Sequence, residues 1–306
     1  MADRKSSLKR RLGYRLGGML LSAGMGLAKI LPLSWCDSLG KGAGKLGFYL
    51  NRKHRTRCIS NLRMCWPNWN SEQVRATAMG VFRHFGKTAM RFLASGKLEK
   101  SQILDSVAAF DDKPIFDAHA EGKGVLLIGA HFGNWERAAQ YLTAKGFQVS
   151  VVARNANDAR TTAKVNKTRE GHGLEVLARG NAAKEILRAL RNQRLVAILP
   201  DQNASDVFVP FFGFMAGTVS GPAVIHLRTG APIVIVMLWE REDGRYEGYS
   251  KRLIVETAAE DREKSVEAIM TQINKEIEAA VREHPEQWLW MHDRWKTARE
   301  RGLLNA

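Results

Sequence analysis

The sequence predicts an α/β fold in which a central, largely parallel mixed sheet is flanked by helices. Three observations lead to this prediction. Short apolar, β-branched runs recur through the middle of the chain, stretches with helical periodicity separate them, and the spacing is that of strand–helix–strand units. Such units join parallel strands by right-handed crossovers, which places the helices on the two faces of the sheet.

The first expected strand is the run VLLI at residues 125–128, which is bounded by glycines and has the length of a buried strand. The next is FQVSVVA at 147–153, where alternation and β-branched residues favour a strand. The later strands are expected at 175–179, 195–199, 231–239 and 246–256, the last of them as an edge strand after an Asp-Gly turn.

Helices are expected between these strands, at residues 134–146, 158–171 and 181–191. An earlier helix begins at Ser71 and has apolar residues at helical spacing. A clearly amphipathic helix spans 261–283 before Pro285.

The 306-residue chain is strongly basic, with 47 Lys and Arg against 31 Asp and Glu and a net charge of +16. The first 57 residues hold 13 of these cations and only two acids, Asp3 and Asp37. This balance predicts an anionic partner, either a membrane surface, a nucleic acid or an acidic protein. Because an uncharged apolar run at 16–28 interrupts the cations, an anionic membrane surface is favoured.

Residues 1–60 are therefore expected to form a basic, apolar, helical membrane-associating segment, and residues 61–306 the main domain. The apolar run has thirteen residues, fewer than the roughly 20 of a spanning helix, and no A-x-A-like cleavage site follows it. An interfacial or short re-entrant helix is favoured over an ordinary core helix. The closing segment 285–296 contains three tryptophans and also suits a membrane interface.

The three cysteines, Cys36, Cys58 and Cys65, show neither CxxC spacing nor a histidine cluster at zinc-finger intervals. This indicates a reducing compartment and no structural metal. We expect all three to be small buried hydrophobes.

The segment HFGNWE, residues 131–136, directly follows the first strand. His131 is expected in the strand-to-helix turn, Asn134 as the helix cap and Glu136 in the first turn. An imidazole backed by a carboxylate is a general base, so His131 and Glu136 are predicted to be the catalytic pair. Taken alone, the pattern favours a capped helix with a surface glutamate. The position of the motif at a strand end, with polar partners downstream, reverses this preference.

Polar residues also follow two other predicted strands: Arg154 comes after 147–153, and Asp201 with Gln202 after 195–199. Because parallel strands end at one edge of a sheet, these side chains should converge with His131. Arg154 would then hold an anionic substrate group, while Asp201 would orient a hydroxyl or that arginine.

HFGNWE matches the H-x4-[D/E] signature of the glycerolipid acyltransferases, and the chain most resembles the bacterial late acyltransferases of lipid A biosynthesis. The similarity covers roughly residues 61–296 and includes, in order, ARNANDAR, LPDQ, VFVPFFG and PEQWLWMHDRWK. Arg169 lies where that family usually has a second arginine. By this resemblance, substrate would be bound by Arg154, Arg169, Asp201, Gln202 and Asn134.

The resemblance implies an O-acyltransferase that moves a fatty acyl chain from an acyl thioester to a hydroxyl of a lipid A precursor or related glycolipid. The donor would be acyl carrier protein or acyl-coenzyme A, and the location the cytoplasmic face of the inner membrane. Neither a metal nor another cofactor is needed. A basic surface would suit an acidic carrier protein. The aromatic stretch 207–223 either lines an acyl groove or folds over the core.

In such a mechanism His131 would deprotonate the acceptor hydroxyl, and backbone amides at 133–135 would hold the oxyanion. The sequence has no G-x-S-x-G motif, and no cysteine lies in the cluster, so a covalent nucleophile has no candidate.

Other interpretations remain open at this point. The acceptor could be a phosphatidylinositol mannoside or a lysophospholipid. A non-catalytic membrane scaffold is a further class. So is a nucleic-acid-binding protein, although no recognised module such as a helix-turn-helix or zinc finger is evident.

Overall fold

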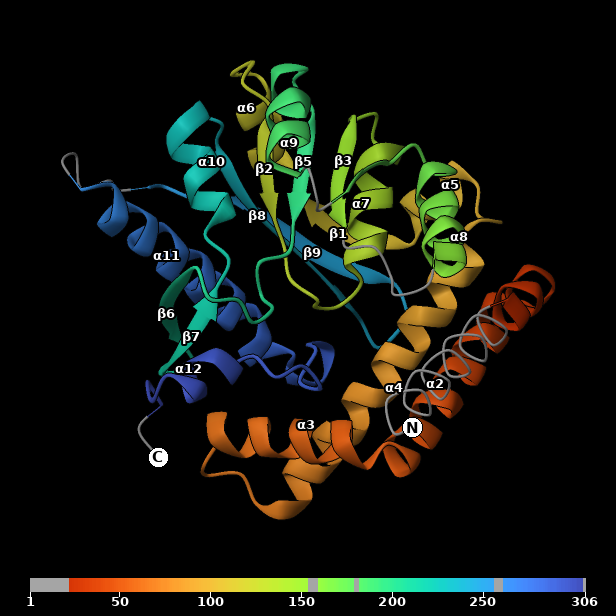
Figure 1. The fold of residues 1–306 in the computed structure, drawn as a ribbon. Coiled ribbons are helices and arrows are strands. Elements are labelled where there is room, and N and C mark those ends of the chain that lie inside the picture. The colour runs from red at the N-terminus through yellow and green to blue at the C-terminus, as the bar shows by residue number, and fades with distance from the viewer. Residues whose placement is uncertain (1–21, 154–158, 179–181, 256–260, 305–306) are drawn as a thin grey trace, which may run out of the picture.

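A seven-stranded sheet forms the centre of the protein, with strand order β1-β9-β8-β2-β5-β3-β4 (Figure 1). The structure is a computed structural model that describes residues 22–153, 159–178, 182–255 and 261–304. The sheet strands are β1 (Val107–Asp111), β2 (Val125–Ile128), β3 (Val149–Ala153), β4 (Glu175–Ala178), β5 (Leu195–Ile198), β8 (Ile233–Glu240) and β9 (Tyr246–Arg252). A separate antiparallel hairpin is formed by β6 (Val207–Phe211) and β7 (Phe214–Thr218).

Helices surround the sheet and precede it in the chain (Figure 1). They are α2 (Leu33–Leu50), α3 (Arg52–Cys65), α4 (Ser71–Ser95), α5 (Lys100–Asp105), α6 (Lys113–His119), α7 (Trp135–Ala144), α8 (Ala159–Glu170), α9 (Ala182–Arg191), α10 (Gly221–Thr229), α11 (Arg262–Glu283), the 3-10 turn η2 (Pro285–Gln287) and α12 (Lys296–Glu300).

Strand β9 runs antiparallel to β8, and the other neighbouring strands of the sheet are parallel. This confirms the predicted α/β fold with a largely parallel mixed sheet. The prediction that 246–256 forms an edge strand is wrong, because β1 pairs with β9 on its outer side. The sequence of β1, VAAFD, is too weakly apolar to be recognised as a strand.

The two faces of the sheet are apolar and each is covered by helices. Leu126 and Ile128 of β2 point into a core with α9, α10 and α11, whereas Val125 and Leu127 point into a second core with α5, α6 and α7. This alternation follows from the period-two geometry of strands. Both faces are therefore sealed, and the open edge at the carboxyl ends of the parallel strands is left for a site.

Helix α2 lies against α4 at very short range. A Cβ added at Gly44 would come within 2.1 Å of the Phe82 carbonyl oxygen, and one at Gly40 within 2.6 Å of the Gly86 carbonyl oxygen. Only glycine permits this approach of two helix backbones. Among the described residues no helix has both the length and the apolar character to cross a bilayer. Residues 16–21 of the apolar run 16–28 lie outside those residues, and residues 22–28 are helical.

The C-terminal tryptophans Trp288, Trp290 and Trp295 are at most 1% exposed. They pack with Phe211 and Phe212 of the β6–β7 region. The prediction that this segment suits a membrane interface is therefore wrong: its aromatic rings fill the protein core. The same packing places these two phenylalanines over the core.

The three cysteines are buried and unpaired, which confirms their prediction as small core residues. Burial raises the pKa of the Cys58 and Cys65 thiols far above their ordinary value.

Candidate active site

His131 lies just beyond β2, and two of its nitrogens bind the same carboxylate. Its backbone N–H donates to Asp201 Oδ2 at 2.9 Å, and its ring Nδ1 lies 2.8 Å from Asp201 Oδ1. The ionised carboxylate can only accept, so Nδ1 carries the proton and Nε2 keeps its lone pair. The imidazole is thereby fixed in the form that can accept a proton at Nε2.

Asp201 is 2% exposed and follows β5, the strand next to β2. Its Oδ2 also accepts a hydrogen bond from Trp288 Nε1 at 3.0 Å. Burial alone would disfavour the charged carboxylate, but the facing imidazole and these hydrogen bonds outweigh it and hold the pKa of Asp201 below its ordinary value.

The pKa of His131 moves the other way. Burial lowers it, but the adjacent Asp201 carboxylate more than offsets that effect and raises the pKa above its ordinary 6.5. The side chain of His131 remains 22% exposed, so Nε2 can be reached. Gln202 is exposed beside it, with Nε2 3.4 Å from His131 Nε2.

Glu136 does not brace His131, and this part of the prediction is wrong. Its carboxylate forms a two-pronged ion pair with Arg169, with 2.5 Å between Arg169 Nη2 and Glu136 Oε1 and 3.1 Å between Nε and Oε2. The sequence therefore predicted that an acid supports the histidine but named the wrong one. Arg169, expected as a substrate-binding residue, is the ion-pair partner of the motif's acid.

The backbone between His131 and α7 explains the glycine and asparagine of the motif. Gly133 has φ +53°, and a Cβ there would lie 1.9 Å from the Leu238 carbonyl oxygen, so only glycine fits. The Gly133 and Asn134 amides donate to the carbonyls of Gln287 and Leu238. The expectation that these two amides hold an oxyanion is therefore wrong.

Asn134 caps α7 and is 3% exposed. Its Oδ1 accepts from the Arg137 amide at 2.9 Å, and its Nδ2 donates to the Tyr246 hydroxyl at 2.7 Å. Because both ends of the amide are engaged inside the protein, its expected role in substrate binding is replaced by a structural one. Arg154, also expected to bind substrate, lies outside the described residues.

Two residues that contact the site were not singled out in the sequence analysis, namely Trp288 and Arg294. Arg294 is completely buried and donates to the carbonyls of Gln202 and Gly217 and to Thr218 Oγ1. Burial lowers the pKa of Arg294 to about 10. Its guanidinium thus ties the loop after β5 to the β6–β7 hairpin. The only sequence signal was their place in the closing motif PEQWLWMHDRWK.

An apolar cavity of about 40 Å³ lies between α7 and the sheet, and its lining includes Ala130 and Phe132, the chain neighbours of His131. Trp135, Leu142 and Val149 also line this cavity. The Trp135 ring also contacts the imidazole, with ring centroids 5.2 Å apart. Within the described ranges, no group of three or more His, Cys, Asp or Glu residues comes together as a metal site.

The site thus combines a histidine–carboxylate pair at two strand ends with an apolar cavity nearby. Comparison with known protein families shows which family the chain belongs to. The family described as bacterial lipid A biosynthesis acyltransferase matches residues 4–297. The chain belongs to this family. Because the family is one of acyltransferases, the chain is assigned to this class of enzyme.

Individual acyltransferases are similar over most of their length. The lipid A biosynthesis lauroyltransferase of Escherichia coli K12 is 25% identical over 278 residues, which is 88% of each chain. A lipid A biosynthesis acyltransferase of Haemophilus influenzae is 26% identical over 90% of this chain and 86% of its own. A phosphatidylinositol mannoside acyltransferase of Mycobacterium tuberculosis is 27% identical over 58% of this chain and 56% of its own.

Proposed function

We propose that this chain transfers a fatty acyl group from an acyl thioester to a hydroxyl of a lipid A precursor or a related glycolipid, with His131 as the general base. The observation that carries the proposal is the His131–Asp201 pair. It leaves Nε2 unprotonated at a partly exposed position. The family match supports the reaction class.

The chemistry needs no covalent enzyme intermediate. Nε2 of His131 takes the proton of the acceptor hydroxyl while the oxygen attacks the thioester carbonyl carbon. The tetrahedral intermediate then breaks its carbon–sulfur bond, and the departing sulfur takes the proton back from the imidazolium. The products are an ester and a free thiol. Asp201 stabilises the imidazolium between these two steps.

Glu136 would act through Arg169 instead of through the histidine. A bidentate pair fixes the plane and position of a guanidinium. Arg169, together with Arg154, would then bind an anionic group of the donor or acceptor, and Gln202 would contact the reacting groups beside Nε2. The apolar cavity next to Trp135 suits the start of a hydrocarbon chain better than it suits water.

The acyl donor we favour is acyl carrier protein, with acyl-coenzyme A as the alternative. A chain with a net charge of +16 would attract an acidic carrier protein. The same charge, concentrated near the N-terminus, would hold residues 1–60 on the anionic cytoplasmic face of the inner membrane.

The acceptor could also be a phosphatidylinositol mannoside, because one relative acts on that class of lipid. A lysophospholipid has no such relative among those compared above. Nucleic-acid binding and a non-catalytic scaffold lose their support, because the family of this chain is one of acyltransferases.

The test is an assay of purified protein with radiolabelled acyl carrier protein thioester, acyl-coenzyme A and candidate acceptors. We expect His131→Ala to lower turnover by about 10²- to 10⁴-fold, the usual contribution of a general base. The matched control is His119→Ala, which removes a histidine at the end of α6. Turnover that survives His131→Ala would contradict the general-base mechanism. Wild-type protein that shows no turnover with any combination of donor and acceptor would contradict the proposed reaction.

A further inference from the structure

Large apolar side chains are exposed mainly on the N-terminal helices. Eleven such side chains are exposed among the described residues, and eight of them lie between residues 27 and 50. On α2 four of them follow helical spacing, namely Trp35, Leu39, Leu46 and Leu50. At about 100° per residue they fall within an arc of roughly 60°, and we call them the α2 stripe. A contiguous apolar surface of this kind marks an interaction site.

The α2 stripe is not the face with which the helix packs into the protein. That face contains Cys36, Gly40, Gly44 and Phe48, which are buried against α4. Each position of the stripe is offset from this packed face, and Leu50 is 74% exposed. Because the glycine contacts lock α2 onto α4, the helix cannot rotate to bury the stripe internally.

The charge around the α2 stripe identifies its partner. Between residues 22 and 57 there are seven Lys and Arg and one acid, Asp37. Four of these cations are exposed, namely Lys41, Lys45, Arg52 and Lys53. The carboxylate of Asp37 instead forms ion pairs with Lys87 and Arg91 of α4. An apolar stripe flanked by unpaired cations matches a bilayer with anionic headgroups. A second copy of the chain would bring like charges face to face.

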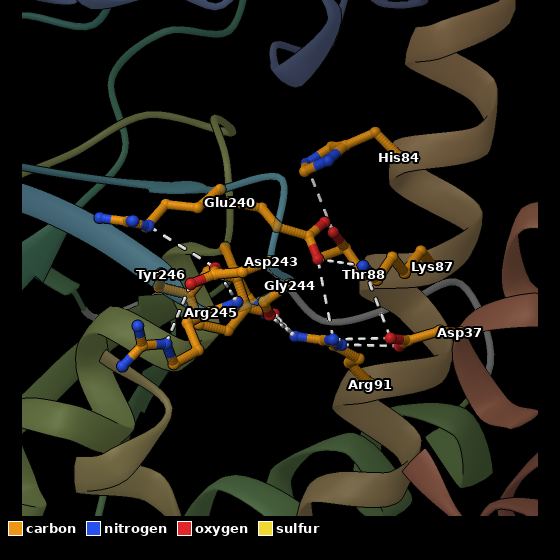
Figure 2. A network of polar contacts seen from close by, with 12 residues as sticks. Asp37, His84, Lys87, Thr88, Arg91, Glu240, Asp243, Gly244, Arg245 and Tyr246 are labelled. Carbon is orange, nitrogen blue, oxygen red and sulfur yellow. Dashed lines mark hydrogen bonds and ion pairs between the residues drawn. The ribbon is translucent and has the colours of Figure 1, made fainter. Parts of the chain in front are cut away.

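A partly buried polar network joins Asp37 of α2 to Arg91 of α4 and to Tyr246 of β9 (Figure 2). Asp37 of α2 accepts two hydrogen bonds of 2.6 Å from Arg91 of α4. Arg91 donates in turn to the Tyr246 hydroxyl at 2.9 Å, and that hydroxyl also accepts from Asn134, the cap of α7. Glu240 at the end of β8 is paired with Lys87 of the same helix, α4. Three side-chain contacts thus join the exposed helix to the HFGNWE motif.

We propose that the α2 stripe docks on an anionic lipid bilayer and that this network holds the docked helix in one orientation relative to His131. The docking itself needs no catalysis. The orienting role rests on the proposed function, because it has a purpose only if the acceptor lies in the membrane.

The docking is tested with an environment-sensitive fluorophore at position 39 of the full chain, introduced by Leu39→Cys. The native cysteines are buried, so they compete little for the label. The matched control is Phe116→Cys on α6, where the exposure is 48% against 46% at Leu39. Phosphatidylglycerol-containing vesicles should shift the emission to the blue at position 39 only, and phosphatidylcholine vesicles should not.

A shift that is absent at position 39, or equal at both positions, would overturn the docking. So would a shift at 39 that depends on protein concentration without vesicles, since it would mean that a second copy covers the stripe. In flotation assays, Trp35→Ser combined with Leu46→Ser should reduce binding to the anionic vesicles at least tenfold, whereas Phe116→Ser should leave binding unchanged.

The network is tested with Asp37→Asn and its conservative partner Asp37→Glu. We expect Asp37→Asn to bind vesicles as wild type does but to lose about tenfold in turnover on an acceptor embedded in the bilayer. Turnover on detergent-dispersed acceptor should fall much less, and Asp37→Glu should restore most of the loss. Equal losses in bilayer and detergent would contradict the orienting role. Wild type inactive in both would contradict the proposed function, while the fluorophore still reports docking.

Discussion

Two buried carboxylates lie near the carboxyl ends of the parallel strands, and they have different ion-pair partners. Asp201, at the end of β5, faces the imidazole of His131 and the indole of Trp288. Glu136, in the first turn of α7, faces the guanidinium of Arg169. A carboxylate paired with a titrating imidazole tunes a base, whereas one paired with a permanently charged guanidinium only positions it. We therefore propose that Glu136, the acid within the H-x4-E motif, positions Arg169.

The largest difference is expected from Asp201→Asn. The amide can present its N–H to His131 Nδ1, which would leave the proton on Nε2 and remove the base. We expect kcat to fall by about 10³- to 10⁴-fold with little change in KM. Steady-state kinetics with the acyl thioester check this. A fall smaller than that of Glu136→Gln would reverse our assignment of the two acids.

A smaller effect, mainly on KM, is expected from Glu136→Gln. Losing one charge-assisted pair releases Arg169, and such a hydrogen bond contributes about 1.5–3 kcal/mol. We expect KM for the anionic substrate to rise about 10- to 100-fold. Arg169→Lys should behave similarly, because a lysine cannot form the two-pronged contact. If kcat instead falls as far as in Asp201→Asn while KM stays constant, Glu136 supports the general base His131 and not Arg169.

The smallest effect is expected from Trp288→Phe, which keeps an aromatic ring but removes one hydrogen bond to Asp201. The carboxylate loses one of three donors, so its charged form is less stabilised. We expect about a tenfold loss of kcat, with KM unchanged. Trp290→Phe is the control, because its indole donates to the Pro285 carbonyl. Equal losses in the two variants would indicate a packing effect.

The convergence of strand ends could be predicted because it depends on topology alone. The sequence predicted that β2 and β5 are parallel strands whose carboxyl ends share one edge of the sheet, and His131 and Asp201 do meet at that edge. The identity of the supporting acid could not be predicted. It depends on the backbone at Gly133, whose positive φ sets the direction in which α7 leaves the turn.

Whether an aromatic segment is buried or exposed also could not be predicted from the sequence. The C-terminal tryptophans and the α2 stripe both combine apolar and basic residues, and a membrane interface was predicted at both ends of the chain. Trp290 is buried because α3 and the β6–β7 region cover it, whereas Trp35 is 64% exposed. Composition does not distinguish these cases, because the covering elements come from distant parts of the sequence.

The pH dependence of kcat/KM tests the His131–Asp201 pair most directly, since it reports the protonation of the free enzyme's base. The base must be neutral to act, so the rate should rise with pH, with a midpoint above 6.5 in the wild type because Asp201 raises the pKa of His131. In Asp201→Asn the residual rate should show its midpoint at lower pH, because burial then lowers the pKa of the imidazole against only the weaker opposing charge of Glu136. An unchanged midpoint in Asp201→Asn, accompanied by a shift in Glu136→Gln, would contradict the account.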